Sequence, residues 1–111
     1  MAPTLPGIPL SGAWALVLTE IPPDRADAIL ARGRAFGESR NICNVHWHSD
    51  VVEGRFMGAA AVARLHAHPA FRAEMEVAKG ELAVVRAKGL KPMRDCLAEA
   101  DALAQEGDTR R

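Results

Sequence analysis

The sequence predicts an all-α protein, built as a bundle of short helices. Aromatic residues make up only 5% of the chain and tyrosine is absent, whereas alanine is abundant. This composition favours tightly packed helices over a β-sandwich, because strands favour β-branched and aromatic side chains. Apolar residues recur at a spacing of three to four, and no segment shows the alternation of a strand. At 111 residues, the chain has room for one hydrophobic core.

The two ends of the chain differ in composition from its middle. Residues 1–11 contain three prolines and Gly7, a combination that resists helix and predicts an irregular N-terminal arm. We expect a single helical domain over residues 12–105. The polar residues 106–111 are expected to form a frayed tail.

Two helices are predicted in the first third of the chain. The continuous apolar run at residues 13–18 indicates a short buried helix, which we expect to end near Pro22 because the residue before a proline disfavours helical geometry. Asp24 lies in the first turn of the next helix, which should end near Gly37. Its buried stripe is expected to contain Ala26, Ile29, Leu30, Gly33 and Phe36.

A third helix is predicted to begin at Ser49 or Asp50, since Asp50 with Glu53 three residues later has the pattern of a capping box. The helix carries Gly54 and Gly58 and a run of small residues after them. Small side chains allow neighbours to approach closely on several faces. We therefore expect this helix to be central in the fold.

Two further helices follow. Pro69 begins the fourth, which the apolar spacing extends to about Ala87, with Gly89 as its stop signal. Gly80 inside this run weakens its continuity. The last helix is predicted over residues 93–104.

Charge and hydropathy exclude two classes of partner. Lys and Arg number 14, equal to Asp and Glu, so the net charge is zero and the balance indicates neither a nucleic acid nor an anionic membrane as partner. The apolar run at residues 13–18 is too short for a membrane span or a secretion signal. We expect no membrane span, and no export signal in the sequence as written. Any anion site must therefore be local.

One short segment carries the residues needed for phosphoryl transfer through a histidine. It reads Ser39-Arg40-x5-His46-x3-Asp50. Arg40 is a permanent cation whose planar fork matches phosphate oxygens. His46 is the candidate nucleophile, with Asp50 accepting the proton of the other ring nitrogen and so fixing tautomer and direction. Ser39 adds a neutral donor for phosphate.

The run SRNICNVHWHSDVVEGRFMGAAAVARLHAHPAF resembles the third signature, SR-x5-H-x3-D, of bacterial class A non-specific acid phosphatases. These belong to the superfamily of type-2 phosphatidic acid phosphatases and vanadium haloperoxidases. The similarity extends upstream through WALVLTEIPPDRADAILARGRAFGESR, which indicates the C-terminal half of the family's helical fold. The resemblance implies that Arg40 contacts phosphate, His46 becomes phosphorylated and Asp50 orients it.

The same resemblance implies phosphomonoester substrates, a periplasmic location, and no cofactor or metal, with phosphate or vanadate as a possible ligand. It also exposes a departure from the family. No histidine precedes His46 and no lysine precedes Lys79, so the family's K-x6-RP and PSGH motifs are both absent upstream of the segment. These motifs supply the cationic clamp on phosphate and the acid for the leaving group.

We therefore expect a truncated copy, cytoplasmic if expressed as written, with little turnover of its own, because general acid catalysis alone contributes roughly 10²–10⁴-fold. The alternative is an inactive helical remnant that binds phosphate or vanadate weakly or associates with another chain. With half of the fold missing, the helices should expose apolar faces, which predicts self-association.

Two H-x-H pairs offer a competing zinc interpretation. They are His46 with His48 and His66 with His68. Neither pair has the i, i+4 spacing of helical zinc ligands and neither has a partner cysteine cluster. We therefore expect no metal site.

Cysteine and tryptophan each leave a structural question open. Cys43 and Cys96 are expected either to form one disulfide or to be small buried residues. Trp14 and Trp47 are predicted to fill the core rather than to form a ligand platform.

Overall fold

A computed structural model describes residues 7–108 of the chain, with the side chains of residues 11–104. Over these residues the chain is all-α, as predicted, and contains no strand. The elements are α1 (Gly7–Glu20), the 3-10 helix η1 (Pro23–Arg25), α2 (Ala26–Ile42), α3 (His48–Leu65), α4 (Pro69–Ala87) and α5 (Cys96–Asp108).

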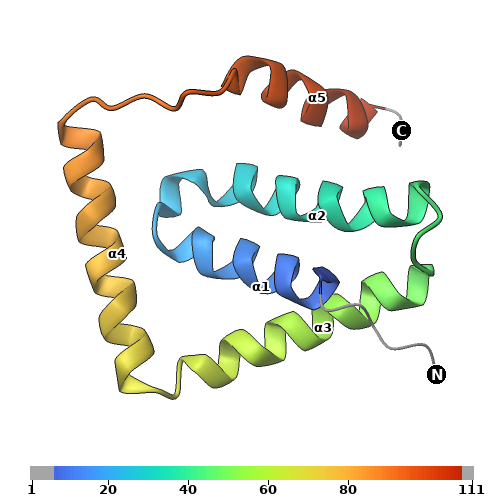
Figure 1. The fold of residues 1–111 in the computed structure, drawn as a ribbon, viewed down its shortest axis with the longest axis horizontal. Coiled ribbons are helices and arrows are strands. Elements are labelled where there is room, and N and C mark those ends of the chain that lie inside the picture. Colours follow the sequence, from blue (N-terminus) through green and yellow to red (C-terminus); the bar gives the residue numbers. More distant parts are fainter. Residues whose placement is uncertain (1–6, 109–111) are drawn as a thin grey trace.

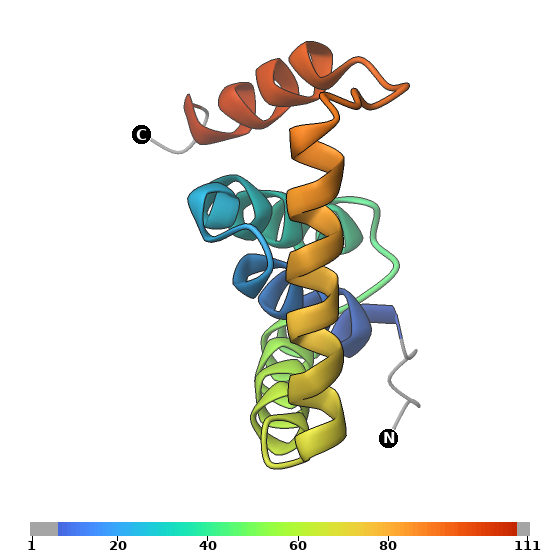
Figure 2. The same ribbon diagram turned by 90° about the vertical axis from the view of Figure 1, so that its left-hand side faces the viewer.

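The helices are arranged as an open bundle. α1 packs against both α2 and α3, and α5 lies along α2 (Figure 1). α4 crosses one end of these helices, joining the end of α3 to the linker before α5 (Figure 2). No helix in the described part of the chain is long and apolar enough to cross a membrane.

α1 and α2 are in very close contact because one of them carries a glycine at the crossing. A Cβ built on Gly33 of α2 would lie 2.7 Å from the Cβ of Ala15 on α1, well inside normal van der Waals separation. Pro22 and Pro23 separate the two helices, as the sequence predicts, since proline ends the preceding helix and starts the next turn. The close crossing therefore depends on the missing side chain at Gly33.

α3 buries one stripe of its surface against α1 and α2. The buried residues of this stripe are Val51, Gly54, Gly58 and Val62. They recur at three- and four-residue spacing, as one helical face requires. Gly37 on α2 faces this stripe, and a Cβ there would be 3.3 Å from Val51 Cγ1. The two glycines of α3 serve close helix packing, as expected from the sequence.

α4 begins and ends where the sequence predicts. Pro69 is at its first turn and the helix continues through Gly80 to Ala87. Gly89 has φ +63°, and two backbone hydrogen bonds, Gly89 N to Arg86 O at 3.0 Å and Leu90 N to Val85 O at 3.3 Å, form a Schellman motif. A left-handed residue is needed here, and glycine adopts that conformation without steric cost.

Side-chain pairs hold α4 against the rest of the molecule. Arg86 donates two hydrogen bonds to the carboxylate of Asp24 in η1, at 3.0 and 3.1 Å. The hydrogen bonds from Arg86 hold the pKa of the Asp24 carboxyl below its ordinary value. At the other end, Nε2 of His66, just after α3, lies 2.8 Å from Oε1 of Glu20 on α1, and its ring meets Phe71 edge-on at 5.3 Å.

α5 has an N-cap that the sequence prediction missed. Asp95 Oδ1 accepts the backbone N–H groups of Leu97 at 3.0 Å and Ala98 at 3.1 Å. A carboxylate in this position satisfies two of the donors left open at a helix start. The helix therefore begins at Cys96 rather than at residue 93.

Several predicted boundaries are wrong. Residues 7–11 belong to α1 rather than to an irregular arm, and residues 1–6 lie outside the described residues, as do 109–111. Residues 106–108 are helical rather than frayed. α2 continues past Gly37 to Ile42, because a glycine inside a helix costs only about 1 kcal/mol and Gly37 is buried against α3.

The core is small, and two predictions about it fail. Among the described side chains, the buried hydrophobic residues are Ala35, Val51, Val62 and Met75. Trp14 and Trp47 are 57% and 78% exposed, so neither fills the core. Cys43 and Cys96 are free thiols and are exposed rather than buried. The prediction of exposed apolar helix faces is confirmed, because large apolar side chains such as Trp14 and Phe56 are exposed on the helices.

Candidate active site

The C-terminal end of α2 carries the first half of the motif. Ser39 and Arg40 lie in its last turn. The helix then closes with a second Schellman motif, in which Asn44 N donates to Asn41 O at 3.0 Å and Val45 N donates to Arg40 O at 3.1 Å. Asn44 has φ +56°, a conformation that asparagine tolerates better than other side chains that carry a Cβ. The chain reverses direction at this point.

This turn places His46 beside Arg40 in the backbone. The N–H of His46 donates to the same carbonyl, Arg40 O, at 3.3 Å. Five residues separate the two positions in the sequence, and the Schellman closure brings their backbones into contact. The spacing of Arg40 and His46 is therefore explained by the helix end.

Asp50 has two roles in the structure. It is the third residue of α3, and its Oδ2 accepts the N–H of Trp47 at 3.1 Å, which is one half of a capping box. The same oxygen lies 3.6 Å from His46 Nδ1. The prediction that Asp50 and Glu53 form the capping box is wrong, because α3 begins at His48 and Asp50 is the acid at the third position.

The His46 and Asp50 side chains form a sheltered pair. Their exposed fractions are 10% and 31%. At 3.6 Å the two atoms are just beyond hydrogen-bond range. Because the carboxylate faces Nδ1, it favours the tautomer with the proton on Nδ1. Nε2 is then left as the ring nitrogen with a free lone pair.

Arg40 and Ser39 form a separate pair on α2. Arg40 Nε donates to Ser39 Oγ at 3.2 Å, and Ser39 Oγ donates to Phe36 O at 2.6 Å. The Arg40 guanidinium carbon lies 5.2 Å from the centre of the Phe36 ring, a cation–π distance. Ser39 therefore occupies Nε of Arg40 and leaves the two terminal guanidinium nitrogens outside this hydrogen bond. The sequence analysis does not identify this contact, although the i, i+4 spacing of Phe36 and Arg40 indicates that the two side chains can meet.

Side-chain contacts therefore join the four predicted residues as two pairs. Ser39 contacts Arg40, and His46 contacts Asp50. The link between the pairs is the Arg40 carbonyl, which accepts the His46 N–H.

A hollow of about 310 Å³ lies between α2 and α3, lined by Glu38, Asn41, Ile42, His48, Val51 and Arg55. None of the four predicted residues lines it. Asn41 Nδ2 lies 3.5 Å from His48 Nδ1, while Asn41 Oδ1 is buried without a hydrogen-bond partner. Asn41 and Arg55 are polar residues that sequence reasoning missed, because only the packing of α2 on α3 brings them to one hollow.

The two H-x-H pairs lie at opposite ends of α3. His46 and His48 flank its start, and His66 and His68 follow its end. Within the described part of the chain, no three side chains of His, Cys, Asp or Glu gather as metal ligands.

Comparison with known proteins identifies relatives of this chain. No protein-family model matches it. It is 47% identical over 74 residues to a non-specific acid phosphatase of Providencia stuartii, covering 67% of this chain and 30% of that protein. It is 45% identical over 78 residues to an acid phosphatase of Zymomonas mobilis, covering 70% and 30%. It is 48% identical over 68 residues to a non-specific acid phosphatase of Salmonella typhimurium, covering 61% and 27%.

The chain thus spans about 30% of the length of the curated relatives it matches. Identity of 45–48% over such segments is far above chance, and it agrees with the resemblance seen in the sequence. Over 61–70% of its length the chain is homologous to bacterial non-specific acid phosphatases.

Proposed function

We propose that this chain carries the nucleophile half of an acid phosphatase site, for hydrolysis of phosphomonoesters through a phosphohistidine at His46. In this reaction His46 Nε2 attacks phosphorus while the bond from phosphorus to the leaving alcohol oxygen breaks. Water then attacks the phosphohistidine, the phosphorus–nitrogen bond breaks, and inorganic phosphate is released. The observation that carries the proposal is the sheltered His46–Asp50 pair, with Nδ1 facing a carboxylate.

Asp50 suits the orienting role because it is itself anchored. Its carboxylate accepts the Trp47 N–H at the start of α3, where the helix dipole also favours negative charge. A carboxylate held in this way favours the proton on Nδ1 of His46 and limits rotation of the ring. The nucleophile is therefore oriented by secondary structure as well as by its own side-chain contact.

Arg40 and Ser39 supply the phosphate-binding side of the proposal. The Phe36 ring lies against the face of the Arg40 guanidinium, and Ser39 Oγ accepts a hydrogen bond from its Nε. Because these contacts already restrict the Arg40 side chain, little side-chain entropy remains to be lost when an anion binds. A planar fork matches two phosphate oxygens. Binding of the transferring phosphoryl group by Arg40 would offset the charge that develops on its oxygens.

The same 111 residues lack the two partner motifs of the family, K-x6-RP and PSGH. Without an acid for the leaving group, turnover falls by roughly 10²–10⁴-fold. This absence favours a second candidate function, an inactive helical module that binds phosphate or vanadate through Arg40 and His46.

Hydrolysis of p-nitrophenyl phosphate at acid pH tests the enzymatic proposal. We expect the chain to hydrolyse this ester slowly and His46→Ala to lose that activity. The control is His48→Ala, because His48 lies outside the proposed machinery. Equal rates for the wild type and His46→Ala would refute the enzymatic proposal for this chain.

Titration with vanadate separates the second candidate from the first. If Arg40 and His46 bind oxyanions, the ring resonances of His46 should shift on addition of vanadate, and Arg40→Gln should abolish the shift. Vanadate that leaves the His46 resonances unchanged would contradict oxyanion binding.

The family resemblance also underlies our proposal that the phosphatase activity belongs to the periplasm. Fractionation of cells that express the native gene, with detection of this chain in periplasmic and cytoplasmic extracts, tests it. Recovery in the cytoplasmic fraction alone would refute this location.

A further inference from the structure

Within the residues that the structure describes, α3 has a second apolar face that is largely exposed. Opposite its buried stripe lie Val52, Phe56, Ala59, Ala60 and Ala63, which form what we call the outer face of α3. Helical periodicity places these residues on one side. Phe56 is 67% exposed, and the three alanines are exposed as well.

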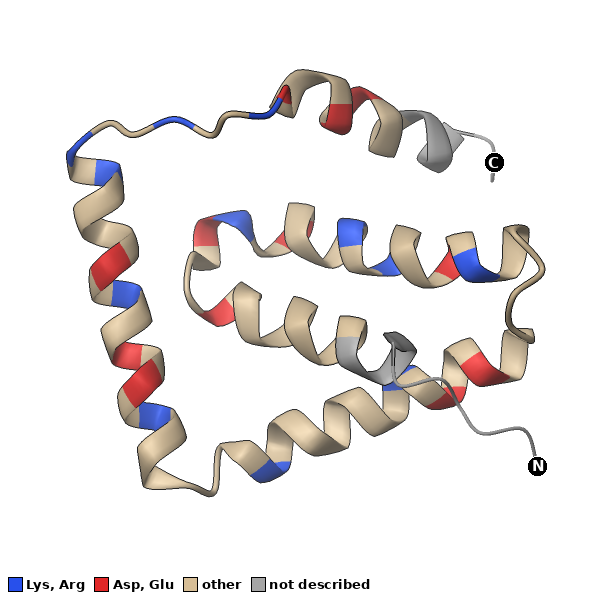
Figure 3. Ribbon diagram, viewed as in Figure 1, with Lys and Arg blue, Asp and Glu red and all other residues tan. Residues whose placement is uncertain are grey.

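The outer face also lacks charge. No charged residue occurs between Arg55 and Arg64, and Figure 3 shows α3 with few charged positions, whereas acidic and basic residues recur along α4. A helix that is apolar on opposite faces is typical of a central helix with neighbours on both sides. The expectation that α3 is central is therefore met on one face only, since α1 and α2 cover the other.

The surface area of the chain indicates how much cover is missing. A compact protein of 11.9 kDa exposes about 5,900 Å², whereas this chain exposes 8631 Å². The excess, about 2,700 Å², is several times the roughly 800 Å² that one partner contributes to a standard interface. The radius of gyration, 15.8 Å, likewise exceeds the about 13 Å expected for a compact chain of this length.

We propose that the outer face of α3 is a docking interface, and that its occupant is a helical segment from the part of an acid phosphatase that this chain does not contain. The chain spans about 30% of its relatives, so more than two-thirds of a relative's length is available to supply that segment. The three alanines leave room for a helix to pack closely, with Phe56 as the anchor side chain.

A second copy of this chain fits the observations less well. It would bring another outer face, but the same sequence, which lacks the K-x6-RP and PSGH motifs. A segment from a whole phosphatase supplies both apolar cover and those groups. Large apolar side chains near His46 in the sequence are also exposed: Ile42 is 79%, Val45 is 55% and Trp47 is 78% exposed. The docked segment could therefore bury apolar surface around the candidate site as well. The inference that the docked segment completes the active site rests on the proposed function. The inference that a segment docks on the outer face does not.

Co-expression tests the docking. The tagged chain is expressed with the Salmonella typhimurium relative from which the matching 68-residue segment has been deleted, and the tag is used to recover both. The tagged 68-residue segment of that relative is the positive control. We expect the chain to recover the deleted relative as a 1:1 complex, and Phe56→Glu to weaken recovery roughly thirtyfold or more, as for an aromatic anchor.

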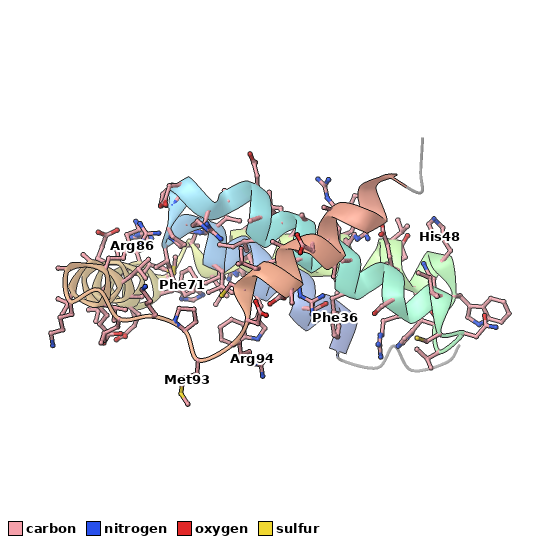
Figure 4. The ribbon with its side chains drawn as sticks, turned by 90° about the horizontal axis from the view of Figure 1, so that it is seen from above. Phe36, His48, Phe71, Arg86, Met93 and Arg94 are labelled. Atoms are coloured by element: carbon pink, nitrogen blue, oxygen red, sulfur yellow. The ribbon has the colours of Figure 1, made fainter. Side chains whose placement is uncertain are left out.

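Matched variants make the result specific. Met93→Glu changes a side chain that is fully exposed in the linker before α5 and points away from the helices (Figure 4), so it should leave recovery unchanged. Ala60→Glu should weaken recovery as Phe56→Glu does, and circular dichroism of each variant alone checks that the helices persist. His46→Ala should bind like the wild type while abolishing any phosphatase activity of the complex.

Three outcomes would overturn the docking proposal. One is recovery of the deleted relative by its own segment but not by this chain. Another is equal recovery by the wild type and Phe56→Glu. The third is a homodimer that Phe56→Glu dissociates and that excludes the deleted relative, which would make a second copy the occupant. A complex that forms but shows no activity dependent on His46 would refute the proposed function and leave the docking intact.

Discussion

Two glycines in helix interiors should respond oppositely to the same substitution. Gly33 lies at the crossing of α2 with α1, where an added Cβ would be 2.7 Å from Ala15 Cβ. Gly80 lies inside α4 with nothing within 4 Å of an added Cβ. Alanine favours the helix over glycine by about 1 kcal/mol at either position. Only Gly33→Ala must also force two helices apart.

The magnitudes decide the sign of each effect. Normal carbon–carbon contact is about 3.5–4.0 Å, so α1 and α2 must separate by about 1 Å in Gly33→Ala. Overpacking of this kind costs about 1–3 kcal/mol. We therefore expect Gly33→Ala to be destabilised by about 1 kcal/mol after the gain in helix propensity. Gly80→Ala should be stabilised by a similar amount.

Urea denaturation followed by circular dichroism measures the first effect. Amide hydrogen exchange along α4 measures the second, because α4 packs little on other helices and can open locally. If Gly33→Ala proved as stable as the wild type or more so, the close crossing of α1 and α2 would be wrong. Faster exchange along α4 in Gly80→Ala would contradict the open surroundings of Gly80.

Three other predictions address pH, capping and the turn before His46. The pKa of Asp24 is lowered in the folded state, so the contact of Asp24 with Arg86 stabilises the fold above the unfolded pKa of about 3.9, and this stabilisation is lost as the pH falls through the lowered pKa. In an NMR titration, the midpoint of Asp24 should return to the ordinary range in Arg86→Gln. An unchanged midpoint would contradict this expectation. Asp95→Ala should destabilise the first turn of α5 by about 1 kcal/mol, seen as faster exchange of the two amides that Asp95 caps, whereas Asp95→Asn should retain most protection. Asn44→Gly should be tolerated, whereas Asn44→Val should lower the free energy of unfolding by about 1–3 kcal/mol, because residue 44 has a positive φ that valine adopts poorly. Equal urea midpoints for these two variants would refute this prediction.

Local signals in the sequence were enough to place some elements. α4 begins at Pro69 and stops before Gly89 as predicted, because both residues act through their own backbone geometry. The break at Pro22 follows from the same kind of local constraint. The all-α class was also predictable, since composition and helical spacing agreed along the chain.

Other features depended on contacts between distant residues and could not be predicted. The sequence predicts a helix end near Gly37, but its burial against Val51 keeps Gly37 inside α2. Trp47 was assigned to the core by residue type, yet it stands at the surface beside the site. Burial depends on which neighbours are present, and residue type does not report that.

The sequence by itself determined the resemblance to acid phosphatases and the candidate residues of half a site, because a motif is a pattern of residue types at set separations. Only the tertiary structure decided how Arg40 and His46 meet, since their backbone contact exists only once α2 ends in a left-handed turn at Asn44. It also decided that α3 has one covered and one open apolar face. An apolar face is a property of the sequence, whereas its cover depends on how the helices pack.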